Sequence, residues 1–133
     1  MRTVLADTSF YAALLNPDDA DHAAALAWSR TPFLHVVVTE FVLVELGNYL
    51  SPGRGRDHLD GLVRHLRADS QTTVVPVSTS LFDAGLDLYS RRRDKEWSLT
   101  DCISFVVMKN RGLTEALATD HHFVQAGFKA LMK

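Results

Sequence analysis

One apolar run constrains the fold of this chain more than any other stretch: from Cys102 to Met108, Ser104 is the only polar residue. A helix as apolar as this is buried on most of its sides and does not lie on a surface with one wet face. Ser98 and Asp101, three residues apart, have the spacing of a capping box at the start of that helix. Asp101 is therefore predicted in the first turn of a buried helix, either as part of the cap or as a functional carboxylate.

The size and composition of the chain indicate one domain, residues 1–133, with enough apolar sequence (47 %) for a core without metal or disulfide support. A single cysteine, Cys102, fits a reducing compartment. Asp7 interrupts the first apolar residues, and no apolar run approaches the length of a membrane span, so we expect a cytoplasmic protein that does not contact the membrane. The net charge of −2 excludes a chain-wide electrostatic grip on nucleic acid but allows a local basic patch.

Segments typical of strands alternate with segments typical of helices along the whole chain. Strands are predicted over residues 3–6, 34–38, 72–77, 115–119 and 128–131. Helices are predicted over residues 10–15, 22–29, 40–50, 59–66, 81–89 and 99–110. This alternation is typical of an α/β fold, a three-layer α/β/α sandwich around a mostly parallel sheet of four to five strands.

Several carboxylates fall where such a fold places its ligands. Asp7 ends the first strand and Asp120 ends the fourth, so two central parallel strands would open both side chains into one crevice. Glu45 lies in mid-helix and shares a face with the core-like residues Phe41 and Val42. Each acid also has a structural explanation: Asp7 as an N-cap, Asp120 as a turn residue, and Glu45 as a narrow polar edge.

Taken together, Asp7, Glu45, Asp101 and Asp120 predict a cluster of four carboxylates from four separate segments. Such a cluster repels itself at neutral pH unless cations or protons compensate the charge. All of the ligand atoms would be oxygens, which suits Mg²⁺ or Mn²⁺ better than zinc. Hydrolysis of phosphodiester bonds is the reaction that this arrangement serves best.

Two further groups of residues have a functional and a structural interpretation. His121 and His122 stand beside Asp120, but the sequence offers no spaced Cys or His partner for a zinc site, so a histidine–metal role is disfavoured. The basic segment formed by Arg91, Arg92, Arg93 and Lys95 either holds RNA phosphates or complements the dipole of a helix end.

Four motifs, in order along the chain, resemble those of PIN-domain ribonucleases, and in particular the VapC-like toxins of prokaryotic toxin–antitoxin pairs. They are residues 4–9 (VLADTS), 44–46 (VEL), 97–102 (WSLTDC) and 118–123 (ATDHHF). One spacing departs from the pattern: Thr119 and Asp120 are adjacent, whereas one residue separates the corresponding pair in many relatives.

The resemblance implies a catalytic and metal-binding quartet of Asp7, Glu45, Asp101 and Asp120, supported by the hydroxyls of Thr8, Ser9 and Thr119. It also implies RNA cleavage that depends on Mg²⁺ or Mn²⁺, homodimers, and inhibition by a cognate antitoxin protein. Two other classes compete with this interpretation: a non-catalytic PIN-like module that binds RNA or a partner, and a receiver-like acidic phosphoacceptor domain. A receiver would have a lysine at the end of a late strand, and the predicted strand ends place none there.

Overall fold

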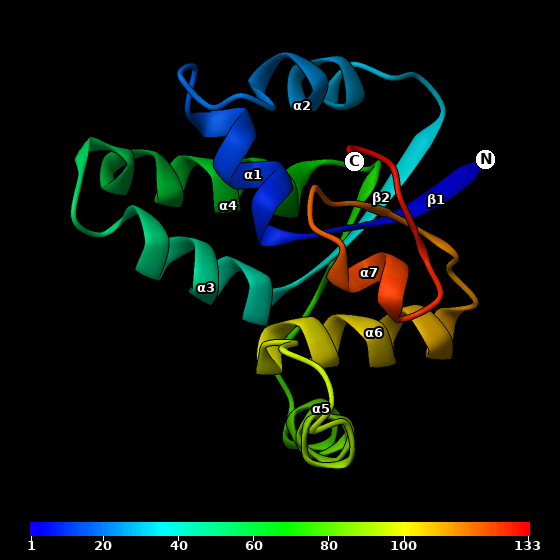
Figure 1. Cartoon of the computed structure of the whole chain (residues 1–133). Coiled ribbons are helices and arrows are strands. Elements are labelled where there is room, and N and C mark those ends of the chain that lie inside the picture. Colours follow the sequence, from blue (N-terminus) through cyan, green and yellow to red (C-terminus); the bar gives the residue numbers. More distant parts are fainter.

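The computed structural model describes residues 1–133, apart from the side chain of Arg54, and contains one sheet of five parallel strands in the order β3-β2-β1-β4-β5 (Figure 1). The strands are Arg2–Ala6 (β1), Leu34–Thr39 (β2), Thr72–Val75 (β3), Glu115–Leu117 (β4) and Lys129–Ala130 (β5). The first strand is the centre of the sheet, hydrogen-bonded to β2 on one side and β4 on the other.

Helices cover both faces of the sheet. They are Thr8–Leu15 (α1), His22–Ser29 (α2), Glu40–Leu50 (α3), Leu59–Ala68 (α4), Thr79–Arg91 (α5), Leu99–Arg111 (α6) and His122–Gln125 (α7), with a 3-10 helix (η1) at Arg54–His58. Among the described residues, no helix combines the length and the apolar character needed to cross a bilayer.

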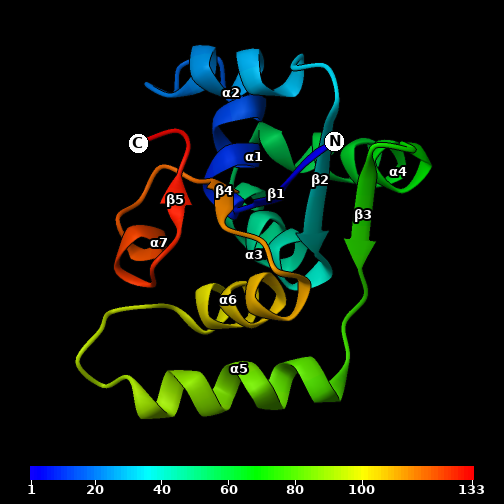
Figure 2. The same cartoon turned by 90° about the vertical axis from the view of Figure 1, so that its right-hand side faces the viewer.

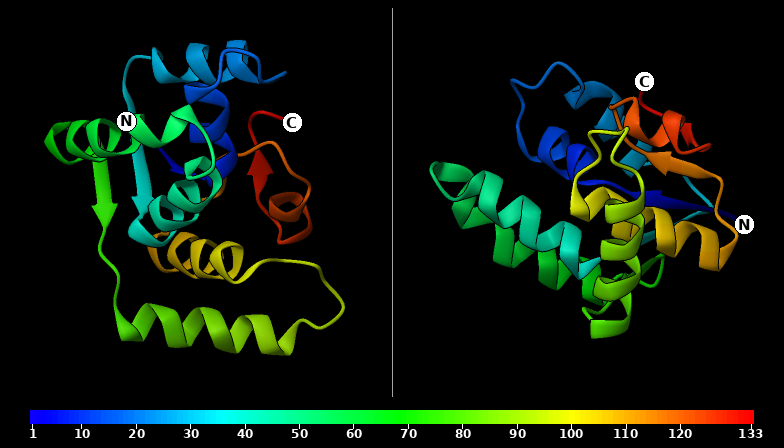
Figure 3. Two further views of the ribbon diagram at one scale, coloured as in Figure 1. Left: turned by 90° about the vertical axis from the view of Figure 1, so that its left-hand side faces the viewer. Right: turned by 60° about the horizontal axis from the view of Figure 1, so that its bottom comes forward.

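Two hydrophobic cores lie on opposite faces of the sheet because successive side chains of a strand point to opposite sides. In β1, Val4 and Ala6 pack into the core formed with α1 to α4, whereas Leu5 packs into the core formed with α6 and α7. The apolar run of α6 belongs to this second core, and α5 packs on the side of α6 that faces away from the sheet (Figures 2 and 3). The predicted α/β/α architecture is confirmed, with α6 buried between the sheet and α5.

Some predicted boundaries are correct, and others are wrong at helix starts and where a strand meets its loop. The bounds of α2 and α3 match the prediction. The strand predicted over 72–77 ends at Val75, because Pro76 has no N–H for the ladder, and the N–H of Val77 donates instead to Glu40 Oε1 (2.8 Å). The strands predicted over 115–119 and 128–131 are also shorter than expected, and α5 begins at Thr79, where the side chain of Ser78 caps it.

Candidate active site

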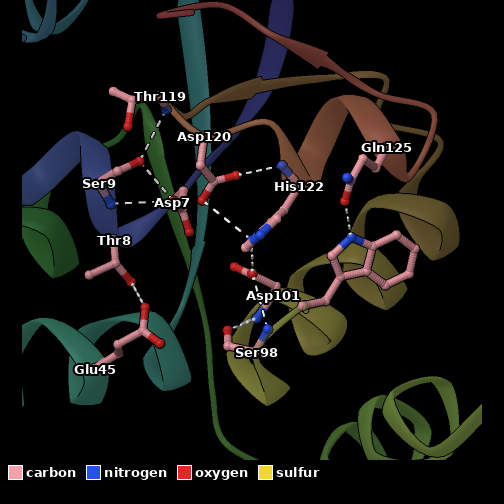
Figure 4. Close-up of polar contacts among 11 residues, drawn as sticks. Asp7, Thr8, Ser9, Glu45, Ser98, Asp101, Thr119, Asp120, His122 and Gln125 are labelled. Carbon is pink, nitrogen blue, oxygen red and sulfur yellow. Dashed lines mark hydrogen bonds and ion pairs between the residues drawn. The ribbon is translucent and has the colours of Figure 1, made fainter. Parts of the chain in front are cut away.

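An open cavity of about 430 Å³ lies beyond the carboxyl ends of β1 and β4. Asp7 follows β1, Asp120 follows β4, Asp101 lies in the first turn of α6, and Glu45 lies in the middle of α3. All four side chains line this cavity (Figure 4). The fold therefore brings the four predicted acids from four separate elements to one place.

The carboxyl of Asp7 is held by the start of α1. Its Oδ2 accepts hydrogen bonds from the backbone N (3.3 Å) and the Oγ (2.7 Å) of Ser9, and Ser9 Oγ accepts one from the backbone N of Thr119 (3.2 Å). Asp7 is only 3 % exposed. Burial, followed by repulsion from Asp101 and then from Asp120, raises the pKa of this carboxyl to about 7.

Asp101 both caps α6 and belongs to the acid cluster, so the two interpretations of its position hold together. Its Oδ2 accepts from the backbone N of Ser98 (3.2 Å), and Ser98 Oγ accepts from the backbone N of Asp101 (3.0 Å), which completes the predicted capping box. The same Oδ2 lies 3.0 Å from Nδ1 of His122. Burial and the charge of Asp120 raise the pKa of Asp101, and hydrogen bonds from His122 and Ser98 offset part of that rise.

His122 is a site residue that the sequence analysis set aside. Its backbone N donates to Asp120 Oδ1 (3.0 Å), and its Nδ1 lies 4.0 Å from Asp120 Oδ2. Asp101, Asp120 and His122 each offer one ligand atom, and these atoms all lie within 4.8 Å of one another. No spacing of Cys or His residues indicates this group, because the partner of His122 is an aspartate from another helix.

Glu45 lies across the cavity from this trio and pairs with α1. Thr8 Oγ1 donates to Glu45 Oε1 (2.5 Å), and Ser9 Oγ donates to Asp7, so two of the three predicted hydroxyls contact acids. Thr119 reaches the site through its backbone N–H. Within the described residues, these contacts occupy one oxygen of Asp7, Asp101 and Glu45 and leave the second oxygen of each without a hydrogen-bond partner.

Two more acids, Asp19 and Asp21, line the cavity from the loop between α1 and α2. Neither acid was among the predicted site residues. Asp21 occupies the N-cap position but makes no capping bond with its side chain, while its backbone N donates to Asp19 Oδ1 (2.8 Å). The sequence offers no signal for this placement, because a local pattern cannot tell where the loop folds back.

The chemistry of this cavity fits a hard divalent cation. The described residues that line it include acids and the partly exposed His122, with no lysine or arginine. Converging carboxylates whose pKa values are raised by burial and by mutual repulsion gain from a bound cation, and oxygen ligands suit Mg²⁺ and Mn²⁺. The missing lysine counts against a receiver domain, as does the strand order, which differs from the 2-1-3-4-5 order of flavodoxin-like folds.

The basic segment lies at the end of α5 and in the loop that follows it. Arg91 pairs with Asp87 and Arg92 with Asp94 (2.9 and 3.0 Å), and the guanidinium of Arg92 stacks 4.9 Å from the ring centroid of Trp97. Lys95 lies 3.8 Å from Asp94, whereas Arg93 is exposed and makes no ion pair with any described residue. Local acids thus pair with Arg91, Arg92 and Lys95. Arg93 is the basic residue of this segment that is most accessible to a ligand.

Comparison with known proteins gives one family over nearly the whole chain. A family model described as "PIN domain" matches residues 4–129. The chain is 32 % identical over 126 residues to the 23S rRNA-specific endonuclease VapC20 from two strains of Mycobacterium tuberculosis, covering 94 % of this chain and 95 % of the relative.

Solved structures agree with this match. The crystal structure of Mycobacterium tuberculosis VapC20, described as a sarcin-ricin loop cleaving toxin, superposes with a TM-score of 0.83 at 31 % identity, covering 94 % of this chain and 95 % of that one. FitAcB from Neisseria gonorrhoeae shares the fold, with a TM-score of 0.63 at 16 % identity, covering 96 % of this chain and 94 % of that one.

Proposed function

Because the chain belongs to the PIN domain family, we propose that it is an endoribonuclease that requires Mg²⁺ or Mn²⁺ and hydrolyses phosphodiester bonds of RNA. The observation that carries this proposal is the convergence of Asp7, Asp101 and Asp120 at one cavity, with Glu45 on its opposite wall. Buried carboxylates that repel one another are costly in a metal-free protein and useful in a metal-binding one.

We propose that Asp7, Asp101 and Asp120 hold the cation and that Glu45 completes the set directly or through water. A bound Mg²⁺ or Mn²⁺ supplies an acidified water and neutralises charge on the scissile phosphate. The surrounding residues position these acids: Ser9 fixes the carboxyl of Asp7, and Thr8 fixes that of Glu45. The second oxygen of Asp7 and that of Glu45 then remain available for a ligand.

The test is cleavage of RNA by purified protein in Mg²⁺, Mn²⁺ or EDTA. Large ribosomal RNA is the first substrate to try, because the relative's name specifies 23S rRNA, and an unstructured RNA serves as comparison. Asp101→Asn is expected to lower the rate by about 100-fold or more, because loss of even an outer partner of a metal ligand typically costs about 10- to 100-fold in metal affinity or activity. Asp60→Asn, an exposed acid of α4 paired with Arg64, is the matched control and should cleave normally. Cleavage that continues unchanged in EDTA would rule out the metal-dependent mechanism.

For the basic segment, we propose that Arg93, with Arg91, Arg92 and Lys95 beside it, contacts phosphates of the bound RNA. The support is the exposed, unpaired side chain of Arg93 on a loop that leads through Trp97 to Asp101. Arg93→Ala should weaken RNA binding. The slope of log affinity against log salt concentration should become shallower by about one unit. An unchanged slope would mean that this segment only complements the dipole of the α5 end and does not contact RNA phosphates.

We further propose that the protein forms a homodimer in the cytoplasm through α5. Phe82, Leu86 and Tyr89 follow one another at i, i+4 and i+7, and each is 40–49 % exposed. A stripe of exposed large apolar side chains on one helix face is typical of a protein–protein contact.

A second surface suits an antitoxin. A groove of about 450 Å³ runs between α1, the end of α2 and α4, and its apolar lining includes Phe10, Leu14, Trp28, Phe33 and Leu62. We propose that an amphipathic segment of a cognate antitoxin binds there, as a helix-in-groove contact. Phe33 supports this proposal because it is 80 % exposed at a positive φ of 58°. A large exposed side chain in this unfavourable backbone conformation does not contribute to the stability of the fold.

A further inference from the structure

The two adjacent histidines lie in different surroundings. The ring of His122 points toward the acids, with Nδ1 3.0 Å from Asp101 Oδ2 and 4.0 Å from Asp120 Oδ2 (Figure 4). His121 is exposed, its ring packs against that of His122 with centroids 4.7 Å apart, and within the described residues it forms no hydrogen bond or ion pair with an acid.

The position of His122 is fixed by contacts on both sides. Its backbone N donates to Asp120, and the next residue, Phe123, is fully buried in the core. At the end of the same helix, Gln125 Oε1 accepts from Trp97 Nε1 (3.0 Å), which ties α7 to the segment that begins α6 and carries Asp101. The imidazole is therefore held in the site before any ligand arrives.

We infer that His122 supplies a nitrogen ligand beside Asp101 and Asp120, and that this makes the site favour Mn²⁺ over Mg²⁺. The inference rests on the proposed function and concerns the same site. Adjacent ligands of an octahedral ion with bonds of about 2.1 Å lie about 3 Å apart, close to the separation of His122 Nδ1 and Asp101 Oδ2. Imidazole nitrogen suits transition metals, whereas Mg²⁺ prefers sites made of oxygen atoms alone.

The chemistry needs only a neutral imidazole with its proton on Nε2, which presents the Nδ1 lone pair to the ion. Without an ion, the same nitrogen is placed to donate to Asp101. In the first arrangement Nδ1 of His122 binds the metal, and in the second it donates to Asp101. Only the first predicts a nitrogen ligand on a bound metal.

Pulsed electron paramagnetic resonance on Mn²⁺-loaded protein tests the inference directly, because a coordinated imidazole couples its ¹⁴N nucleus to the manganese. We expect this coupling in the parent protein and in His121→Ala, and its loss in His122→Ala. The Kd for Mn²⁺ should rise by roughly 10-fold or more in His122→Ala, while the Kd for Mg²⁺ changes less. Thermal melting without metal verifies that each variant is folded.

Bound Mn²⁺ without ¹⁴N coupling in the parent protein would overturn the inference. His122 would then act only as a hydrogen-bond donor to Asp101, and the proposed nuclease with oxygen ligands would stand. Equal loss of Mn²⁺ and Mg²⁺ affinity in His122→Ala would also contradict the predicted selectivity. Absence of Mn²⁺ binding with retained Mg²⁺ binding would overturn the inference alone, whereas absence of binding of both cations would overturn the inference and the proposed function together.

Discussion

Asp7 is a carboxyl group whose surroundings disfavour its own charge. Its pKa of about 7 lies well above the value of 3.8 that applies in an unfolded chain, because burial and the neighbouring acids favour the protonated form. In this range the folded protein binds more protons than the unfolded chain, so this group makes the free energy of unfolding fall as pH rises from about 4 to about 7. A bound cation is expected to remove this penalty.

The prediction is measured as melting temperature against pH in EDTA. Asp7→Asn should flatten the decline between pH 5 and pH 7.5 and melt higher than the parent at pH 7.5, because an amide retains an oxygen that can accept from Ser9. With Mg²⁺ at about ten times its Kd, the parent should gain on the order of 1.4 kcal/mol. A variant with the same pH profile and the same gain as the parent would remove Asp7 from the cluster.

Between helices, the contact of α5 with α6 depends on a residue without a side chain. A Cβ on Gly85 would lie 2.3 Å from Ile103 Cγ1 and 3.2 Å from the backbone N and Cα of Ile103. The backbone of α6 cannot yield as a flexible side chain does, and α6 carries Asp101 in its first turn. The close approach of these helices therefore also supports the site.

Gly85→Ala should destabilise the protein by about 1–3 kcal/mol, as overpacking does in a tight core. Chemical denaturation of Gly61→Ala provides the matched control, since Gly61 lies in α4 and a Cβ there meets nothing within 4 Å. That substitution should be neutral or stabilise by up to about 1 kcal/mol, the difference in helix propensity. Equal effects in the two variants would contradict the role of Gly85 in packing.

The elements that could be predicted from the sequence are those whose boundaries depend on neighbours in the chain. The bounds of α3 follow from the Thr39 cap and the turn after Leu50, and the capping box of α6 follows from Ser98 and Asp101. The four-residue helix α7 has too few residues for a periodic pattern. Within the site, acids at strand ends were predictable, because parallel strands share an edge.

The contributions of Asp19, Asp21 and His122 were not predictable in the same way. Each depends on where a loop or a short helix folds back against a distant element, and nothing within a few residues specifies that placement. His122 is the clearest case, since its nearest acid lies 21 positions earlier in the chain.

For the whole molecule, the α5 stripe and the groove beside α1 predict two separate contacts. Replacing Phe82 and Leu86 with Glu should convert the dimer to a monomer in light scattering and leave antitoxin binding intact, because the groove is untouched. Phe33→Asn should weaken antitoxin binding and leave the dimer intact, because asparagine tolerates the positive φ but lacks the apolar ring. Co-purification with a candidate antitoxin protein measures the second contact. A parent protein that stays monomeric at high micromolar concentration would contradict the dimer.

The pairing of β1 with β4 also has a consequence for when the proposed site assembles during synthesis of the chain. Leu5 of β1 pairs with Ala116 of β4. The central strand β1 is synthesised first, and its partner β4 follows more than a hundred residues later in the chain. Asp7 meets Asp120 only after this late pairing, and such distant contacts form slowly. If the proposed site is correct, a nascent chain on the ribosome carries these acids apart, and we expect it to be inactive on RNA until almost all of it has emerged.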